Sequence, residues 1–185
     1  MRDLLLKRCL LLATVVVLAL GLFGAGVGCG GGSTPQAGDP PQGEDDKAPD
    51  FTLATLGGSE VTLSQFEGTP VVLNFWSTKC GFCVKELPDF ERIAIDSGGD
   101  VVIIAIDVGE TEARIKTFFD GYEPTMIVGL DKDMQAFAAY SRKYNNPRGS
   151  IPFTILIDSK GRVQDQRLGA YSSEAEIWAA VSQLS

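Results

Sequence analysis

The most constraining feature of this sequence is the stretch VVLNFWSTKCGFCVKELP at residues 71–88, where an apolar run leads into two cysteines three residues apart. The run at residues 71–76 is interrupted only by Asn74, which is typical of a strand buried on both faces near the centre of a sheet. The helical pattern that follows places Cys80 where strand gives way to helix. A helix N-terminus favours an anion, so we expect a stabilised thiolate at Cys80, with Cys83 one turn later and within disulfide reach.

Histidine is absent from the chain, and its absence excludes several classes of site. Ser-His-Asp and Cys-His catalysis, histidine-containing metal sites and haem ligation by histidine all need the missing residue. Four cysteines occur, at positions 9, 29, 80 and 83, and only the last two fall in the part of the chain that we expect to fold. Two sulfurs cannot complete a tetrahedral zinc site, so we expect neither a metal nor another cofactor.

The length of the chain limits how many domains it can form, and its charge limits which partners it can bind. A chain of 185 residues is long enough for one domain with a real core plus appendages. Its formal net charge of −8 gives a surface that repels nucleic acid, which we therefore do not expect as a partner. We expect the folded domain to be a monomer.

Residues 1–28 have the pattern of an export signal peptide rather than of a folded segment. Basic residues precede an uncharged apolar stretch at residues 9–27, which ends in several glycines before Cys29. The sequence GVGC at residues 26–29 resembles the lipobox of bacterial lipoproteins, in which the cysteine becomes lipid-modified after cleavage. Gly26 departs from that pattern, because a large aliphatic residue usually stands there. The alternative is an uncleaved anchor, since the apolar run approaches the ~20 residues that span a bilayer.

We favour lipidation of Cys29, and either alternative leaves the domain outside the cytoplasmic membrane, in the periplasm or at the cell surface. Residues 29–46 contain glycine, proline, serine and acids without apolar periodicity, a composition that predicts a flexible tether. The pattern changes at Lys47, so we place the folded domain at residues 47–185.

Within this domain, apolar runs alternate with helical periodicities. A short hairpin is expected over residues 48–63, and the buried run at residues 71–76 follows it. We expect helices over residues 80–95, bent at Pro88, over 110–119, over 131–140, where Asp131 is the candidate cap, and over 173–184, and further strands over 101–106, 126–130, 154–157 and 162–168. This alternation predicts an α/β fold in which a central sheet is covered on both faces.

The motif WSTKCGFC at residues 76–83, between a buried strand and a helix, resembles the active site of the thioredoxin fold. Pro152, preceded by Ile151 and followed by a strand, matches the cis-proline that faces the cysteines in that fold. The resemblance implies a thioredoxin-like three-layer α/β/α sandwich with a central mixed sheet, an N-terminal hairpin and an inserted segment before the cis-proline loop.

The resemblance is closer to the TlpA/ResA branch of exported thiol-disulfide oxidoreductases, within the AhpC/TSA-Redoxin superfamily. That branch shows Ala-Pro-Asp-Phe at the start of the domain, Asn-Phe-Trp before the cysteines and a Cys-x-x-Cys-x-x-Glu-x-Pro signature that includes both cysteines. These signatures are matched here at residues 48–51, 74–76 and 80–88, and the likeness covers residues 48–184.

The resemblance implies that Cys80 is the nucleophile, that Cys83 is the resolving cysteine and that Glu86 belongs to the active site. Cytoplasmic thioredoxins carry a buried aspartate at the position of Asn74, so Glu86 is the remaining candidate to help deprotonate Cys83. A solvated surface acid is the alternative for Glu86.

Four residues are predicted to contact substrate, namely Trp76, Phe82, Ile151 and Pro152, although for Trp76 we favour packing over chemistry. Lys79 and Phe82 depart from relatives, many of which have tryptophan and proline there. Lys79 is expected to tune the redox potential if its amine lies near Cys80, and it is an ordinary surface lysine otherwise.

The sequence thus predicts a membrane-tethered oxidoreductase that reduces disulfides of client proteins, of the cytochrome c maturation type, and is recharged by a membrane redox partner. The motif itself does not set the direction of electron flow. A peroxiredoxin-like peroxidase is one alternative, but Leu73 and Ser77 stand where its motif has proline and threonine. The other is a non-catalytic lipoprotein binding module whose disulfide is structural, although so short a bridged loop stabilises little.

Overall fold

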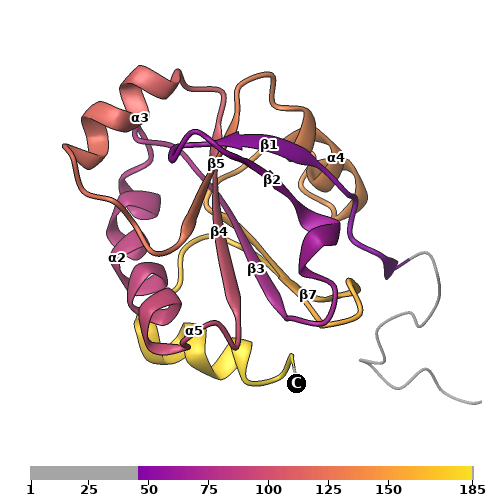
Figure 1. Cartoon of the computed structure of the whole chain (residues 1–185). Coiled ribbons are helices and arrows are strands. Elements are labelled where there is room, and N and C mark those ends of the chain that lie inside the picture. Colours follow the sequence, from indigo (N-terminus) through magenta and orange to yellow (C-terminus); the bar gives the residue numbers. More distant parts are fainter. Residues whose placement is uncertain (1–45, 185) are drawn as a thin grey trace, which may run out of the picture. The chain divides into compact units, whose positions relative to one another are not determined.

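The computed structural model describes residues 46–184 (Figure 1). The predicted signal peptide, Cys29 and nearly all of the predicted tether lie outside the described residues. Within residues 46–184, seven strands form one sheet in the order β2-β1-β5-β4-β3-β6-β7. No helix in this range is long and apolar enough to cross a membrane.

The elements follow the predicted alternation of strands and helices. Their bounds are β1 Thr52–Thr55, β2 Glu60–Thr62, the 3₁₀ helix η2 Leu63–Phe66, β3 Val71–Trp76, α2 Gly81–Asp96, β4 Val102–Val108, α3 Glu112–Phe119, β5 Ile127–Asp131, α4 Gln135–Lys143, β6 Phe153–Ile157, β7 Val163–Leu168 and α5 Glu174–Val181.

Strand β3 lies in the interior of the mixed sheet, between β4 and β6, and positions the cysteines. It pairs parallel to β4 and antiparallel to β6, and every residue of β3 and β6 is buried. The predicted strand buried on both faces is therefore confirmed. In the β3–β6 register, Phe75 pairs with Phe153, so the residues just before β6 come to the end of β3 from which the chain enters α2.

Two hydrophobic cores, one on each face of the sheet, make the three layers of a thioredoxin-like sandwich (Figure 1). On one face α2, α3 and α5 pack against side chains that include Val72 and Trp76. On the other face α4 packs against alternate residues of β3, including Leu73 and Phe75. Because side chains alternate along a strand, Asn74 belongs to the face covered by α2.

Two helix starts differ from the prediction because local capping decided them. Thr111, rather than Glu110, caps α3 by accepting a hydrogen bond from a backbone N–H of the first turn, which leaves Glu110 free to face inward. Asp131 was expected to begin the next helix, but the helix starts at Gln135 after Met134 in a left-handed conformation (φ 55°). The Asp131 carboxylate still accepts two first-turn N–H hydrogen bonds, at 3.3 and 2.7 Å.

One face of helix α2, which carries the cysteines at its start, is buried against the sheet. Substitutions of two isoleucines on this helix test that packing. Ile93 is fully buried, whereas Ile95 on the same helix is 52% exposed. We expect Ile93→Ala to lower the free energy of unfolding by about 2–5 kcal/mol, because it leaves a cavity against the sheet. Ile95→Ala makes the same chemical change in solvent and is expected to stay within about 0.5 kcal/mol. Guanidinium denaturation measures both, and equal losses would contradict the assigned helix face.

Candidate active site

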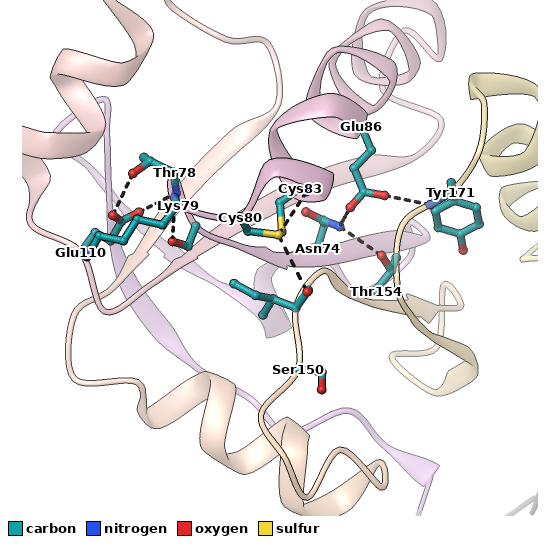
Figure 2. The surroundings of a disulfide bond; sticks show 12 residues. Asn74, Thr78, Lys79, Cys80, Cys83, Glu86, Glu110, Ser150, Thr154 and Tyr171 are labelled. Carbon is teal, nitrogen blue, oxygen red and sulfur yellow. Dashed lines mark hydrogen bonds between the residues drawn. A yellow bond between two sulfur atoms is a disulfide. The ribbon is translucent and has the colours of Figure 1, made fainter.

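The two cysteines lie at the start of α2 and form a disulfide with Cα atoms 5.2 Å apart (Figure 2). Cys80 is the N-cap residue, and its Sγ accepts a hydrogen bond from the backbone N–H of Cys83 at 3.2 Å. That N–H and the helix dipole would stabilise a thiolate at Cys80. Cys83 is completely buried while Cys80 is partly exposed, so a protein partner can reach only the first sulfur.

The loop before β6 faces the disulfide, as the β3–β6 register requires. The Ile151–Pro152 peptide bond is cis, which confirms the conformation expected at this position. The carbonyl oxygen of Ile151 lies 3.8 Å from Cys80 Sγ (Figure 2). Pro152 is buried, Ile151 is partly exposed and the preceding Ser150 is exposed. A client segment that reaches Cys80 would therefore pass beside this loop.

Glu86 is buried behind the disulfide, with 2% of its surface exposed, so the alternative of a solvated surface acid is wrong. One carboxylate oxygen accepts a hydrogen bond from Asn74 Nδ2 and the other from the backbone N–H of Tyr171, both at 2.9 Å (Figure 2). Burial raises the pKa of Glu86, and these hydrogen bonds partly offset the rise. A carboxyl group with a raised pKa can exchange a proton nearer to physiological pH.

Asn74 connects Glu86 to the sheet. Its Nδ2 group donates a second hydrogen bond, to Thr154 Oγ1 at 3.1 Å on the neighbouring strand β6. The sequence pattern marked Asn74 as the one polar interruption of an apolar strand. Thr154 and the Tyr171 backbone were missed, because strand pairing and the chain entering α5 bring them here from 80 and 85 residues away.

Comparisons with known proteins agree with this geometry. The sequence pattern of the AhpC/TSA family matches residues 45–166. The chain belongs to the AhpC/TSA family. It is 34% identical over 128 residues to the thiol-disulfide oxidoreductase ResA of Geobacillus kaustophilus, covering 69% of this chain and 70% of ResA. It is 31% identical over 134 residues to the thioredoxin-like protein YneN of Bacillus subtilis, covering 71% of this chain and 75% of YneN.

Solved structures show the same fold. The exposed lipoprotein thioredoxin Etrx1 of Streptococcus pneumoniae superposes with a TM-score of 0.63 at 26% identity, over 74% of this chain and all of that one. A protein of Chlorobium tepidum described as a putative thiol:disulfide interchange protein DsbE superposes with a TM-score of 0.61 at 28% identity. The match covers 74% of this chain and 96% of that one. The protein is therefore a thiol-disulfide oxidoreductase of the ResA/DsbE type, with a thioredoxin-like fold.

Trp76 and Phe82, both predicted to contact substrate, lie in opposite environments. Trp76 is fully buried and packs against the rings of Phe118 and Phe119, with centroids 5.2 and 6.0 Å away. Direct substrate contact is therefore wrong for Trp76, because β3 turns its side chain toward α3. Phe82 is 69% exposed between the two cysteines, with the ammonium group of Lys85 6.0 Å from its ring centroid.

An acidic cluster on the other side of the motif was not foreseen from the sequence. Glu110, which is buried, accepts hydrogen bonds from the Thr78 backbone N–H at 2.6 Å and from Thr78 Oγ1 at 2.8 Å (Figure 2). It also pairs with Arg114 at 2.7 Å. These contacts fix the turn that leads into Lys79 and Cys80. The sequence showed only two acids three residues apart after the apolar run at residues 101–106, which does not reveal that Glu110 meets Thr78.

Asp107 is the second acid of this cluster, at the end of β4 and fully buried. It accepts a hydrogen bond from the backbone N–H of Glu110 at 3.1 Å. Burial, with the nearby Glu110 carboxylate, raises the pKa of Asp107 to about 7. Burial acts in the same direction on Glu110, but the hydrogen bonds from Thr78 outweigh it and lower the pKa of Glu110. Near neutral pH Asp107 is therefore partly protonated, while Glu110 is ionised.

The raised pKa of Asp107 predicts a pH dependence of stability. Between about pH 4 and about pH 7 the folded state binds more protons at Asp107 than the unfolded state does, so this residue makes the free energy of unfolding fall as pH rises, by up to about 1.4 kcal/mol per pH unit. In Asp107→Asn this contribution disappears, so the variant should gain stability relative to the wild type across that window. Denaturation at a series of pH values measures the difference.

The matched control for this pH series is Asp100→Asn, which neutralises an exposed carboxylate in the turn before β4. Its stability should follow the wild-type curve closely. A constant difference between Asp107→Asn and wild type from about pH 4 to about pH 8 would contradict the assigned protonation of Asp107.

Proposed function

We propose that this protein reduces disulfide bonds of client proteins outside the cytoplasmic membrane, with Cys80 as the nucleophile and Cys83 as the resolving cysteine. The observation that carries this proposal is the unequal exposure of the two sulfurs, since Cys80 is accessible beside the cis-proline loop and Cys83 is buried below it. Only Cys80 can approach a client sulfur without movement of the helix.

The proposed reaction has two exchanges. The Cys80 thiolate attacks one sulfur of the client disulfide, forms a mixed disulfide and releases the first client thiolate, which takes up a proton. Cys83 then loses its proton and attacks Cys80 Sγ, which releases the second client thiolate and forms the Cys80–Cys83 disulfide. Two electrons pass from the cysteine pair to the client, and a membrane redox partner must return them.

The groups around the sulfurs have distinct proposed roles. The backbone at Ile151 and Pro152 aligns a client segment as an added strand, and the exposed Phe82 ring contacts its apolar side chains. Glu86 is the proton acceptor that helps ionise Cys83. Lys79 is exposed next to Cys80, and its proposed effect on the redox potential rests on that position alone.

The proposed location is a membrane surface outside the cytoplasm, with a lipid on Cys29 and residues 29–46 as the tether. Support comes from the export-signal pattern at residues 1–28 and from the likeness to a protein described as an exposed lipoprotein thioredoxin. The likeness to ResA supports a reductant, and we propose the haem-binding cysteines of apocytochrome c as clients.

Trapping of mixed disulfides tests the proposed order of attack. The full-length Cys83→Ser variant should accumulate a covalent adduct with a disulfide-containing client peptide, because the first exchange proceeds and the second cannot. Cys80→Ser removes the accessible nucleophile and is expected to yield no adduct at the motif, although it keeps Cys83. Non-reducing electrophoresis with mass spectrometry reads the adducts. Adducts on Cys83 in the Cys80→Ser variant, at rates equal to those of Cys83→Ser, would reverse the assignment.

The direction of electron flow is tested by the redox state of the pair in living cells. A protein that works as a reductase should be held with more than half of its Cys80–Cys83 pairs reduced, because the membrane partner keeps supplying electrons. Acid quenching followed by alkylation and mass measurement gives this fraction. A predominantly oxidised pair would instead identify a disulfide donor.

A further inference from the structure

One buried polar atom beside the disulfide lacks a partner within residues 46–184: the amide oxygen Oδ1 of Asn74. The nitrogen of the same amide donates to both Glu86 and Thr154, at 2.9 and 3.1 Å. Asn74 is fully buried, so bulk water does not reach it. A buried acceptor left without a donor is unfavourable, and most such atoms in proteins are paired.

The oxygen lies on the side of the cysteines. Asn74 belongs to the same face of β3 as Val72 and Trp76, which pack in the core that contains Cys83. Figure 2 shows the amide oxygen turned toward the disulfide and the nitrogen turned toward Glu86 and Thr154. The amide is held in this orientation, because flipping it would set its oxygen against the Glu86 carboxylate oxygen.

The disulfide offers no donor to this oxygen, whereas the reduced pair does. Reduction breaks the Sγ–Sγ bond with two electrons, leaves Cys80 as the thiolate stabilised at the helix N-terminus and adds a proton to Cys83 Sγ. We propose that Asn74 is a positioning residue for the resolving cysteine, whose thiol donates a hydrogen bond to Asn74 Oδ1 in the reduced protein.

This hydrogen bond would make the Cys80 thiol ionise before the Cys83 thiol. It stabilises the neutral thiol of Cys83, so that Cys80 alone is ionised while the protein waits for a client. An amide, unlike a carboxylate at the same position, cannot take the proton, so Asn74 holds the thiol while Glu86 remains the acceptor. It also favours the reduced protein over the disulfide form, in which the oxygen has no donor. The inference rests on the proposed roles of Cys80 and Cys83.

The S–H stretching vibration of Cys83 tests the inference directly. The reduced full chain, with Cys9→Ser and Cys29→Ser, is treated with iodoacetamide so that the accessible Cys80 is alkylated and the buried Cys83 keeps its proton. The infrared S–H band should lie at lower wavenumber than that of a cysteine thiol in an apolar solvent, because the bond to an amide oxygen weakens S–H. A band at the free-thiol position would overturn the proposal, and this measurement needs no variant at Asn74.

Two variants change the contacts of the Asn74 amide. Asn74→Leu removes the acceptor at similar volume, together with the hydrogen bonds of the amide nitrogen to Glu86 and Thr154, and the S–H band should move to the free-thiol position. Thr154→Val removes only the other partner of the amide nitrogen and should leave the band unchanged. With glutathione, the equilibrium constant for reduction should fall about fivefold in Asn74→Leu, the effect of one net hydrogen bond, and stay near wild type in Thr154→Val.

An unshifted band in folded Asn74→Leu would also overturn the inference, as would equal effects of the two variants on the redox equilibrium. Neither measurement uses a client protein. Failure of the proposed client reduction would therefore appear in the trapping assay while the S–H band of Cys83 stayed shifted, and the two ideas can fail separately.

Discussion

The burial of β3 on both faces is the constraint on which the active site depends. Because the strand is held between β4 and β6, its end is fixed relative to both neighbours, and the chain must leave the sheet at Cys80. The antiparallel pairing with β6 then brings the cis-proline loop to the same edge. Two sulfurs and a peptide carbonyl thus meet because of strand register, without a direct bond between the two loops.

Buried acids lie on both sides of the cysteine motif, and they serve different ends. Glu86 sits behind the disulfide, where Asn74 and the Tyr171 backbone satisfy both carboxylate oxygens. Glu110 lies on the other side of the motif. Through its hydrogen bonds with Thr78 it holds the turn that leads into the cysteines. In a low-dielectric interior such groups are favourable only when their hydrogen bonds are complete. The amide oxygen of Asn74 is a buried acceptor without a partner within residues 46–184, and in our proposal it gains a donor when the disulfide opens.

The membership in the AhpC/TSA family and the likeness to ResA fix the class of reaction. Phe82 presents an exposed aromatic ring between the cysteines, and the ammonium group of Lys85 lies over it. The buried groups surround the sulfurs, and in our proposal the exposed Phe82 contacts the client.

The cis-proline that faces the cysteines was implied only by the resemblance to the thioredoxin fold. The sequence by itself determined the order of strands and helices and the position of both cysteines at a strand–helix junction. These features depend on local apolar periodicity and on a compact motif, which neighbours in sequence largely specify. It could not determine that Glu86 is buried rather than solvated, that Trp76 is hidden from a client, or that Asp107 and Glu110 meet beside Thr78. Those outcomes were decided by tertiary structure, because burial and hydrogen-bond partners depend on strand register and helix packing between residues that lie far apart in the chain.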